Sequence, residues 1–238
     1  MAKPSTISPI KKTTRAASAK SRLAFQKAPA KRKYEGGVRE QKKQDTLSRI
    51  LDSALIHFAE KGFEAASVRD ICADAGVTHA LIRLHFGSKE LLWQAAVDYL
   101  FERMNQEMAL PPGEPRMREG LEGLKAFARR YVKYCARHPE HARLMLQESM
   151  HRNDRLRYAV RKHISSAHEF MYAGVKKAVA NGDMPRISPI SFIYILSAAS
   201  QMVFALAEEA REIYQIDVLS DEFVAQHTDA VIKLLFRK

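Results

Sequence analysis

The sequence predicts an all-α protein with a small three-helix head, which contains a helix-turn-helix, and a larger helical body. From residue 45 onward apolar residues recur at spacings of three and four, the period of amphipathic helices. No segment alternates apolar and polar residues for long enough to be a convincing strand, and no internal repeat is present. A chain of 238 residues with 46% hydrophobic content suits a soluble globular protein of a small and a larger domain.

The net charge of +12 is concentrated in residues 1–43. This segment has 13 Lys or Arg and two acids, a net charge of +11, which leaves +1 for the remaining residues. It lacks apolar periodicity and cannot bury enough surface to offset the entropy of ordering, so we expect a disordered basic N-terminal arm. Its Ser-rich, acid-poor composition also resembles a transit peptide, which leaves organelle targeting as an alternative.

The two cysteines, Cys72 and Cys135, each fall on an apolar helical face. Two thiols at unrelated places do not make a disulfide framework, so we expect two core residues in a reducing compartment and a cytoplasmic protein. No run of about 18 uncharged apolar residues occurs, so no membrane span is expected. The longest apolar-rich stretch, residues 187–207, contains Ser and Gln and is interpreted as a buried helix.

The first helix of the head is predicted from Asp45, which can cap its N-terminus, to Gly62, which ends it. Apolar residues at helical spacing form one face of this segment, and we expect that face to pack in the core of the head. These residues are Leu47, Ile50, Leu51, Ala54, Leu55, Phe58 and Ala59.

Two short helices follow and form the predicted helix-turn-helix. Ser67 and Asp70 have the spacing of a capping box at the start of the first of them, which ends at Gly76. Thr78 is the predicted N-cap of the second, which covers about residues 79–86. Two short helices that share a tight Gly-containing turn and pack on an amphipathic helix are what a helix-turn-helix needs, because the second helix must project while the first braces it.

A fourth helix, predicted at about residues 88–108, links the head to the body. Its expected inner face consists of Leu91, Leu92, Ala95, Ala96, Tyr99 and Leu100, and the Pro-rich run at residues 111–115 breaks the chain after it. The predicted domains are the arm at residues 1–43, the helix-turn-helix domain at residues 44–93 and the body at residues 94–238. Further helices are predicted in the body at about residues 116–136, 139–149, 153–181, 189–214 and 221–236.

Three runs in the head carry a specific resemblance to a known family. They are Ile50-Leu51-Asp52-Ser53-Ala54 continuing through Phe58-Ala59-Glu60-Lys61-Gly62-Phe63, then Ser67-Val68-Arg69-Asp70-Ile71-Cys72-Ala73-Asp74-Ala75-Gly76-Val77, and His85-Phe86-Gly87-Ser88-Lys89-Glu90-Leu91-Leu92. With these spacings, both glycines and the closing Phe-x-Ser-Lys-Glu-x-Leu pattern, the chain resembles the TetR/AcrR family of helix-turn-helix transcriptional regulators over about residues 45–93. In the body the resemblance is limited to His138-Pro139-Glu140, followed by Arg143-Leu144 and Glu148.

The resemblance implies a DNA-binding head and a larger body that binds a ligand and forms the dimer. Such a regulator binds a palindromic operator as a symmetric dimer. The expected partners are therefore double-stranded DNA, a second copy of the chain and an unidentified small-molecule effector, without a cofactor and without a membrane. The favoured function is a ligand-responsive repressor, in which effector binding shifts the fourth helix and changes the separation of the two heads.

The third helix of the head is expected to enter the major groove with its N-terminal residues. His79 and Arg83 have the greatest capacity for hydrogen bonds to base edges. Family members often place Tyr where Arg83 stands, so whether Arg83 contacts a base or a phosphate stays open. Ser67, His85 and Lys89 are expected to hold phosphates. The predicted DNA-binding residues are Ser67, Thr78, His79, Ala80, Ile82, Arg83, His85 and Lys89.

The body is predicted to supply the dimer interface and the ligand pocket. The resemblance implies that its last two helices form a four-helix bundle with the partner, and core packing within one chain is the competing interpretation for each residue. The expected interface residues are Phe192, Ile195, Leu196, Ala199, Val203 and Leu206. The expected pocket residues are Phe127, Tyr131, Met145, Met150, Phe170, Met171 and Tyr172.

Two pairs of histidines, His138 with His141 and His163 with His168, raise the question of a metal site. Neither pair has a Cys or carboxylate placed to complete a ligand set, so no metal is expected. No Gly-rich phosphate loop, nucleophile elbow or metal-ligand motif is present, and an enzyme is therefore not expected.

The basic arm leaves one competing function open. Lys and Arg next to a DNA-binding head add attraction to phosphates that does not depend on sequence and weakens as salt rises. An architectural nucleic-acid binder, driven by the arm and with a body that only dimerises, is therefore the alternative to the repressor. A solvated arm without a specific role is the simplest interpretation of the same composition.

Overall fold

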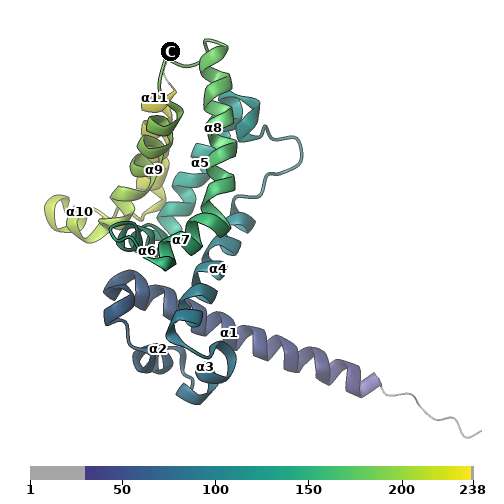
Figure 1. Ribbon diagram of the computed structural model, residues 1–238. Helices are drawn as coiled ribbons and strands as arrows, with labels where there is room; N and C mark the ends of the chain where they lie inside the picture. The colour runs from purple at the N-terminus through teal and green to yellow at the C-terminus, as the bar shows by residue number, and fades with distance from the viewer. Residues whose placement is uncertain (1–29, 237–238) are drawn as a thin grey trace, which may run out of the picture. The chain divides into compact units, whose positions relative to one another are not determined.

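The computed structural model describes residues 30–236, and every regular element in that range is a helix (Figure 1). The predicted all-α class is therefore confirmed for the described part of the chain. The chain divides into two compact units between Gln41 and Lys42. The packing and contacts given below are those within residues 42–236.

The first helix, α1, is Ala30–Ala65 and begins well before Asp45. Residues 30–43 are therefore helical, although the whole arm was expected to be disordered, while residues 1–29 lie outside the described residues. The stretch before Asp45 consists mainly of Arg, Glu, Gln and Lys, which are good helix formers and extend an existing helix without an apolar face. Apolar periodicity does not detect such an extension. Gly62 breaks α1 as predicted, with φ 73° and ψ 167°.

The helix-turn-helix consists of α2, Val68–Ala75, and α3, His79–Phe86. Ser67 Oγ accepts a hydrogen bond from the Asp70 amide at 3.4 Å, and Thr78 Oγ1 accepts one from the Leu81 amide at 3.3 Å, so both predicted caps form. Gly76 ends α2 in the left-handed conformation, with φ 64° and ψ 40°. The turn between the two helices is therefore the one that the glycine predicts.

The fourth helix, α4, is Lys89–Glu107 and starts from the N-cap Ser88. Leu92, Ala96 and Leu100 are buried as expected, whereas Leu91 is exposed. The buried face is wider than predicted because α4 packs against the head on one side and against α6 and α7 on another. Further buried residues on α4 are Trp93, Val97 and Phe101.

The body contains seven α-helices among the described residues, and the boundaries depart from the expected ones in three places. A 3-10 turn at Met117–Glu119 precedes the first of them, a π-helical turn at Val160–Ile164 interrupts the long predicted helix at 153–181, and the predicted helix at 189–214 breaks at Leu206. The body helices are α5 Leu121–Arg137, α6 Pro139–Ser149, α7 Asp154–Ala159, α8 Ser165–Ala180, α9 Pro189–Ala205, α10 Ala207–Tyr214 and α11 Asp221–Leu235.

None of the helices described here is, taken singly, long and apolar enough to cross a membrane. The pair α9 and α10 would be long and apolar enough in combination, but its two members are bent by 64° relative to each other.

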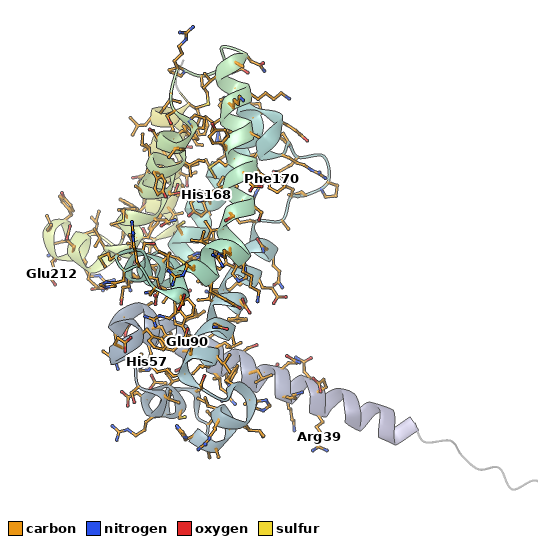
Figure 2. All side chains as sticks on the ribbon, viewed as in Figure 1. Arg39, His57, Glu90, His168, Phe170 and Glu212 are labelled. Carbon is orange, nitrogen blue, oxygen red and sulfur yellow. The ribbon has the colours of Figure 1, made fainter. Side chains whose placement is uncertain are left out.

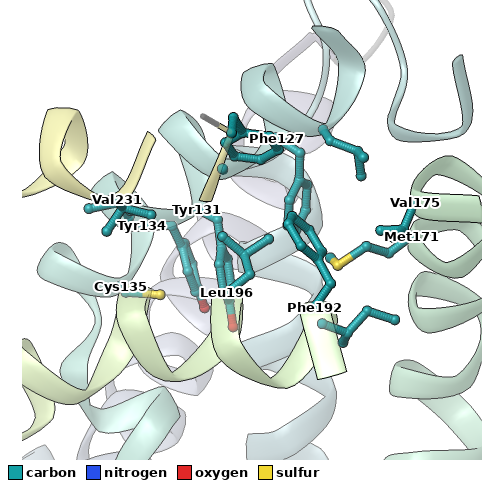
Figure 3. Close-up of a cluster of buried hydrophobic side chains, with 14 of the residues drawn as sticks. Phe127, Tyr131, Tyr134, Cys135, Met171, Val175, Phe192, Leu196 and Val231 are labelled. Carbon is teal, nitrogen blue, oxygen red and sulfur yellow. The ribbon is translucent and has the colours of Figure 1, made fainter. Parts of the chain in front are cut away.

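Buried apolar side chains form two separate clusters. The first, which we call the head core, contains Phe58 and Trp93 of the head together with Leu144 of α6 and Ala159 of α7. The second, the body core, joins α5, α8, α9 and α11 (Figure 3). Met104 on α4 packs against both. The apolar packing of the head therefore extends into α6 and α7, which lie within the predicted body at residues 94–238. Both cysteines are buried, Cys72 in the head core and Cys135 in the body core.

Candidate nucleic-acid interface

The second helix of the helix-turn-helix, α3, has one face in the head core and one face exposed. His79, Ala80 and Arg83 lie on the exposed face, as predicted for residues near DNA bases, and His85 is also exposed. Ile82 is only 3% exposed and belongs to the head core, so its predicted place in the DNA interface is wrong. The physical reason is helix phase, because residue 82 points to the side of α3 that must bury apolar surface on α1 and α2.

Leu84 is a candidate interface residue that the sequence reasoning missed. It is 77% exposed, which is unusual for an apolar side chain in a small head. The missed signal is its spacing of four from Ala80, which places both residues on the same helix face. Apolar side chains at this place can contact the methyl group of thymine in the major groove.

The predicted phosphate contacts Ser67 and Lys89, and Thr78, which was predicted to lie near the bases, have different environments. Ser67 and Thr78 accept hydrogen bonds as N-caps, but each hydroxyl also carries a donor that a phosphate can accept. Lys89 is held within the head, because its Nζ donates to the Glu64 carbonyl at 3.1 Å and lies 4.7 Å from the centre of the Phe63 ring. A phosphate contact by Lys89 would have to replace the bond to Glu64.

The helix that precedes α3, α2, contributes a basic side chain that was not among the predicted DNA-binding residues. Arg69 on α2 has a side chain that is 91% exposed, so it is available to phosphates next to the groove. On the other side of the helix-turn-helix, Arg49 donates from Nη1 to the Ala75 carbonyl at 3.1 Å and fixes the C-terminus of α2 to α1. His57 and Asp74 make a further pair between the same two helices. These contacts hold α2 as a rigid brace for α3.

The residues expected at the dimer interface separate into two groups. Phe192 and Leu196 are fully buried in the body core of their own chain, so the prediction of an interface is wrong for these two (Figure 3). Ala199 and Val203 are partly buried against the same core, whereas Ile195 and Leu206 are exposed. The apolar stripe read from the sequence follows the face of α9 that packs on α5 and α8, because α9 is apolar on more than one side.

The residues expected to line a ligand pocket are not brought together. Phe127 and Tyr131 stack at 5.3 Å between ring centres in the body core, where Met171 also lies (Figure 3). Met145 packs instead against the head core. The other three, Met150, Phe170 and Tyr172, are exposed, and Phe170 is visible on α8 in Figure 2. Tyr172 lines a surface groove of about 300 Å³ between α8 and α9.

The interior of the body core carries polar groups that are uncharged. Gln201 on α9 donates a hydrogen bond from Nε2 to the hydroxyl of Tyr131. Burial raises the pKa of the Tyr131 hydroxyl well above its usual range and raises the pKa of the Cys135 thiol to about 12, so both stay protonated. Ser200 is completely buried, and its Oγ has no hydrogen-bond partner among the described residues. A ligand in this region would therefore meet apolar and neutral polar groups.

The histidines considered for a metal each have other partners. His138 lies 2.6 Å from Glu107 through Nε2, and His141 lies 2.8 Å from the Tyr134 hydroxyl through Nδ1. Burial lowers the pKa of His141 to about 4, which keeps the ring neutral. His163 contacts Asp98 at 2.7 Å. In residues 30–236, no group of three or more His, Cys, Asp or Glu is arranged to hold a metal ion.

Two family descriptions match the chain. Residues 50–96 match "Bacterial regulatory proteins, tetR family", and residues 121–235 match "Tetracyclin repressor-like, C-terminal domain". The transcriptional repressor NicS of Pseudomonas putida is 30% identical over 118 residues, which are 48% of this chain and 53% of NicS. The regulator UidR of Escherichia coli is 38% identical over 81 residues, which are 34% of this chain and 37% of UidR. These matches thus span about half of the relatives' length or less.

Solved structures share the fold. The structure of AibR in complex with isovaleryl coenzyme A and operator DNA has a TM-score of 0.66 at 16% identity, covering 80% of this chain and 98% of AibR. A transcriptional regulator from Streptomyces coelicolor, SCO4942, has a TM-score of 0.57 at 19% identity, covering 81% of this chain and 99% of that one. At these identities the likeness concerns the arrangement of helices.

Proposed function

Because this chain belongs to the TetR family of bacterial regulatory proteins, we propose that it is a transcriptional repressor that binds a palindromic operator as a homodimer and releases it when an effector binds. The observation that carries the proposal is the construction of α3. The N-cap Thr78, the tight turn at Gly76 before it and the buried Ile82 fix α3 to the head, while the other face of α3 is exposed. A helix held in this way can be inserted into a major groove.

The exposed face of α3 supplies the groups for base recognition. Arg83 presents two parallel donors to the O6 and N7 of guanine, a contact with discrimination of about 1–3 kcal/mol. His79 offers one further donor or acceptor to a base edge. Leu84 and Ala80 contact thymine methyl groups between these polar contacts. Arg69 and His85, together with Ser67 at the start of α2, hold the flanking phosphates and set the register.

The proposed dimer uses the exposed apolar face of α9 and α11. Ile195 on α9 and Leu206 directly after it are exposed, and Leu234 on α11 is 79% exposed. Ala198 and Ala230 lie exposed on the same two helices and allow close approach of a second pair of helices. A two-fold arrangement of these faces gives a four-helix bundle and presents two heads to half-sites about 34–36 Å apart.

The proposed effector site lies in the body core, next to the Tyr131 and Gln201 pair. A ligand there would displace Phe127 or Met171 from the packed core and could hydrogen-bond the buried Ser200 Oγ. AibR, whose fold is similar, binds isovaleryl coenzyme A and operator DNA, which supports an effector for this chain as well. The packed state described here corresponds in this proposal to a protein without effector.

Selection of duplexes from a random library by the purified full-length chain tests the proposal. We expect the enriched sequences to be palindromic and to bind with saturable affinity at moderate salt. Native mass spectrometry of the complex should show two chains for each duplex, and the free protein should be screened for a small molecule that purifies with it. Absence of any enriched palindrome would contradict the repressor.

The basic arm favours one second candidate, an architectural nucleic-acid binder. Residues 1–29 contain seven Lys or Arg and no acid. Removal of these residues should leave the selected palindrome preferred and give a shallower dependence of affinity on salt. If sequence preference and affinity both disappear with the arm, the architectural function is the better account.

A further inference from the structure

The head is attached to the body beside Gly62, where α1 breaks. Gln147 of α6 donates from Nε2 to the Ala59 carbonyl at 2.6 Å. The other end of the same amide occupies the space next to Gly62, where a Cβ would clash with Gln147 Oε1. Gly62 therefore combines a positive φ with a close approach from the body. The residue that follows it, Phe63, is directed to the border between α1, α4 and α7.

Arg155 of α7 packs on this phenylalanine. Its guanidinium carbon lies 3.9 Å from the centre of the Phe63 ring, and the ring of Phe63 in turn stacks on Phe58 in the head core at 5.9 Å between ring centres. Lys89 at the start of α4 approaches the same ring. A guanidinium over an aromatic ring gains from both electrostatic attraction and flat packing. An arginine of the body thus contacts the head through an apolar as well as a charged surface.

The same guanidinium joins three carboxylates from three helices. Its Nε lies 3.1 Å from both oxygens of Glu148 on α6, while Nη1 lies 3.7 Å from Glu90 on α4 and Nη2 lies 3.8 Å from Glu64 on α1. The side chain of Arg155 is 17% exposed and that of Glu148 only 4% exposed. Glu90 is labelled in Figure 2, close to the junction of head and body.

The two sides of this contact differ in strength. The contact to Glu148 is short, buried and supported by Asn153, which donates to Glu148 at 2.9 Å. The contacts to Glu64 and Glu90 are longer, and both carboxylates are exposed to solvent. Arg155 is therefore fixed to the body, and its outer nitrogens hold the head through contacts that can loosen without disturbing a core. Of the three guanidinium nitrogens of Arg155, Nη1 faces Glu90 and Nη2 faces Glu64 of the head, while Nε faces Glu148.

The geometry points to Arg155 as a positioning residue for operator binding, which sets the angle of the head on the body and so the distance between the two recognition helices of a dimer. Glu90 is the second residue of α4 and follows α3 after a short turn, so a change at Glu90 is passed directly to the recognition helix. This inference rests on the proposed function, because a head angle has an effect on DNA only when two heads bind together.

The test uses the full chain with Glu64→Gln and Glu90→Gln combined. The side chain of Glu64 is 88% exposed and that of Glu90 is 42% exposed, so the variant keeps the buried pair of Arg155 with Glu148 and the fold. The matched control is Asp154→Asn, which removes an ion pair with Arg157 that lies within α7 and does not involve the head. Affinity is measured for duplexes with the selected palindrome and for the same half-sites moved apart or together by one and two base pairs, together with a single half-site.

We expect the double variant to lose about threefold to tenfold of the preference of the wild type for the correct spacing. The control should keep the spacing preference of the wild type. Any change in affinity for a single half-site should appear as the same factor in the affinities for all spacings. Loss of two acids from the head raises attraction to any DNA, but such a change cancels in the ratio between spacings. An unchanged ratio in the double variant overturns the inference.

A second measurement does not depend on DNA. A spin label at Ala73→Cys, an exposed position on α2, reports the distance between the two heads of the dimer, since both native cysteines are buried. The distance distribution should be broader in the double variant than in the wild type and the control. An equally narrow distribution contradicts the role of Arg155 even if no palindrome is selected, whereas failure of selection alone contradicts only the proposed function.

Discussion

The head core and the body core differ in the side chains that lie along the border between them. On the head side the border carries charge, because Arg103 of α4 contacts Asp52 at 3.4 Å and Glu140 at 2.5 Å, and Arg155 contacts three further carboxylates. On the side of the body core the border also contains buried, uncharged rings, among them Tyr134 and His141. The strength of an ion pair depends on salt and on the charge of each partner, whereas the stability of packed rings depends on changes in side-chain volume. The charged contacts of the head with α6 and α7 are thus adjustable, while the apolar packing of the head core continues across them to Leu144 and Ala159.

The largest expected effect comes from removing volume in the body core. Phe192→Ala should lower the free energy of unfolding by about 3–5 kcal/mol, because a fully buried ring is replaced by a cavity. Trp93 is the only tryptophan and lies in the head core, so its fluorescence follows the head while far-UV circular dichroism follows the whole chain. We expect the circular dichroism transition to fall further than the Trp93 transition. Equal shifts of both would show that the two cores unfold as one.

The second effect concerns pH at the border. The pKa of His141 is about 4 in the folded chain against 6.5 in the unfolded one, so between these values the unfolded state binds more protons. Stability is therefore complete above pH 6.5 and is lost as pH falls toward 4, by roughly 3 kcal/mol at most. His141→Gln should flatten denaturation free energies measured across this window. Glu107, Glu140 and Asp98 also have lowered pKa values, but their losses begin below about pH 4.5.

The third effect is confined to the outer surface of the head. Arg83→Ala should weaken binding to the selected palindrome by about 1–3 kcal/mol and reduce discrimination at one base pair, with no change in unfolding. Arg69→Ala is the comparison, since loss of a phosphate contact weakens all duplexes alike. Competition binding against duplexes with single substitutions separates the two. Equal weakening for every sequence would assign Arg83 to a phosphate.

The smallest effect is expected at the exposed end of the charged border. Asp52→Asn removes one partner of Arg103, but Asp52 is nearly half exposed, so the free energy of unfolding should change by less than about 1 kcal/mol. The difference between wild type and variant should also disappear at high salt, measured by urea denaturation. A decrease of several kcal/mol in the free energy of unfolding would show that Asp52 contributes as a buried charge does. It would contradict the view that the charged border contributes less to stability than the body core.

The two regions also differ in how well the sequence predicts them. In the head, α1 and α2 each have one clear apolar stripe, and caps such as Ser67, Gly76 and Thr78 have local chemistry, so α2, α3 and their turn could be placed in advance. The error at Ile82 arose in α3, where apolar residues occur on both faces and the tertiary contact decides which is buried. Leu84 is also an apolar residue of α3 that sequence alone does not assign to a face, but it is exposed where Ile82 is buried.

In the body, α9 is apolar on several sides, so no periodicity separates Phe192 and Leu196, which are core, from Ile195, which is exposed. The predicted pocket failed for a related reason. Aromatic and sulfur-containing residues fill cores as readily as they line cavities, and sequence spacing does not show whether Phe127 and Phe170 lie on the same side of the body. Only packing distances make that distinction.

The π-helical turn at Val160–Ile164 allows one continuous helical run to serve two cores. Before the turn Ala159 faces the head core, and after it Met171 and Val175 face the body core. A π turn holds one residue more than an α turn, and each residue rotates a helix by about 100°. A regular α-helix over the same number of residues would therefore direct its far half about 100° away from its partners, whereas deletion of one residue together with the π turn would keep both halves in register. The extra residue of the π turn therefore sets the rotation of the chain between the two cores. It keeps the apolar residues before the turn on the head core and those after it on the body core.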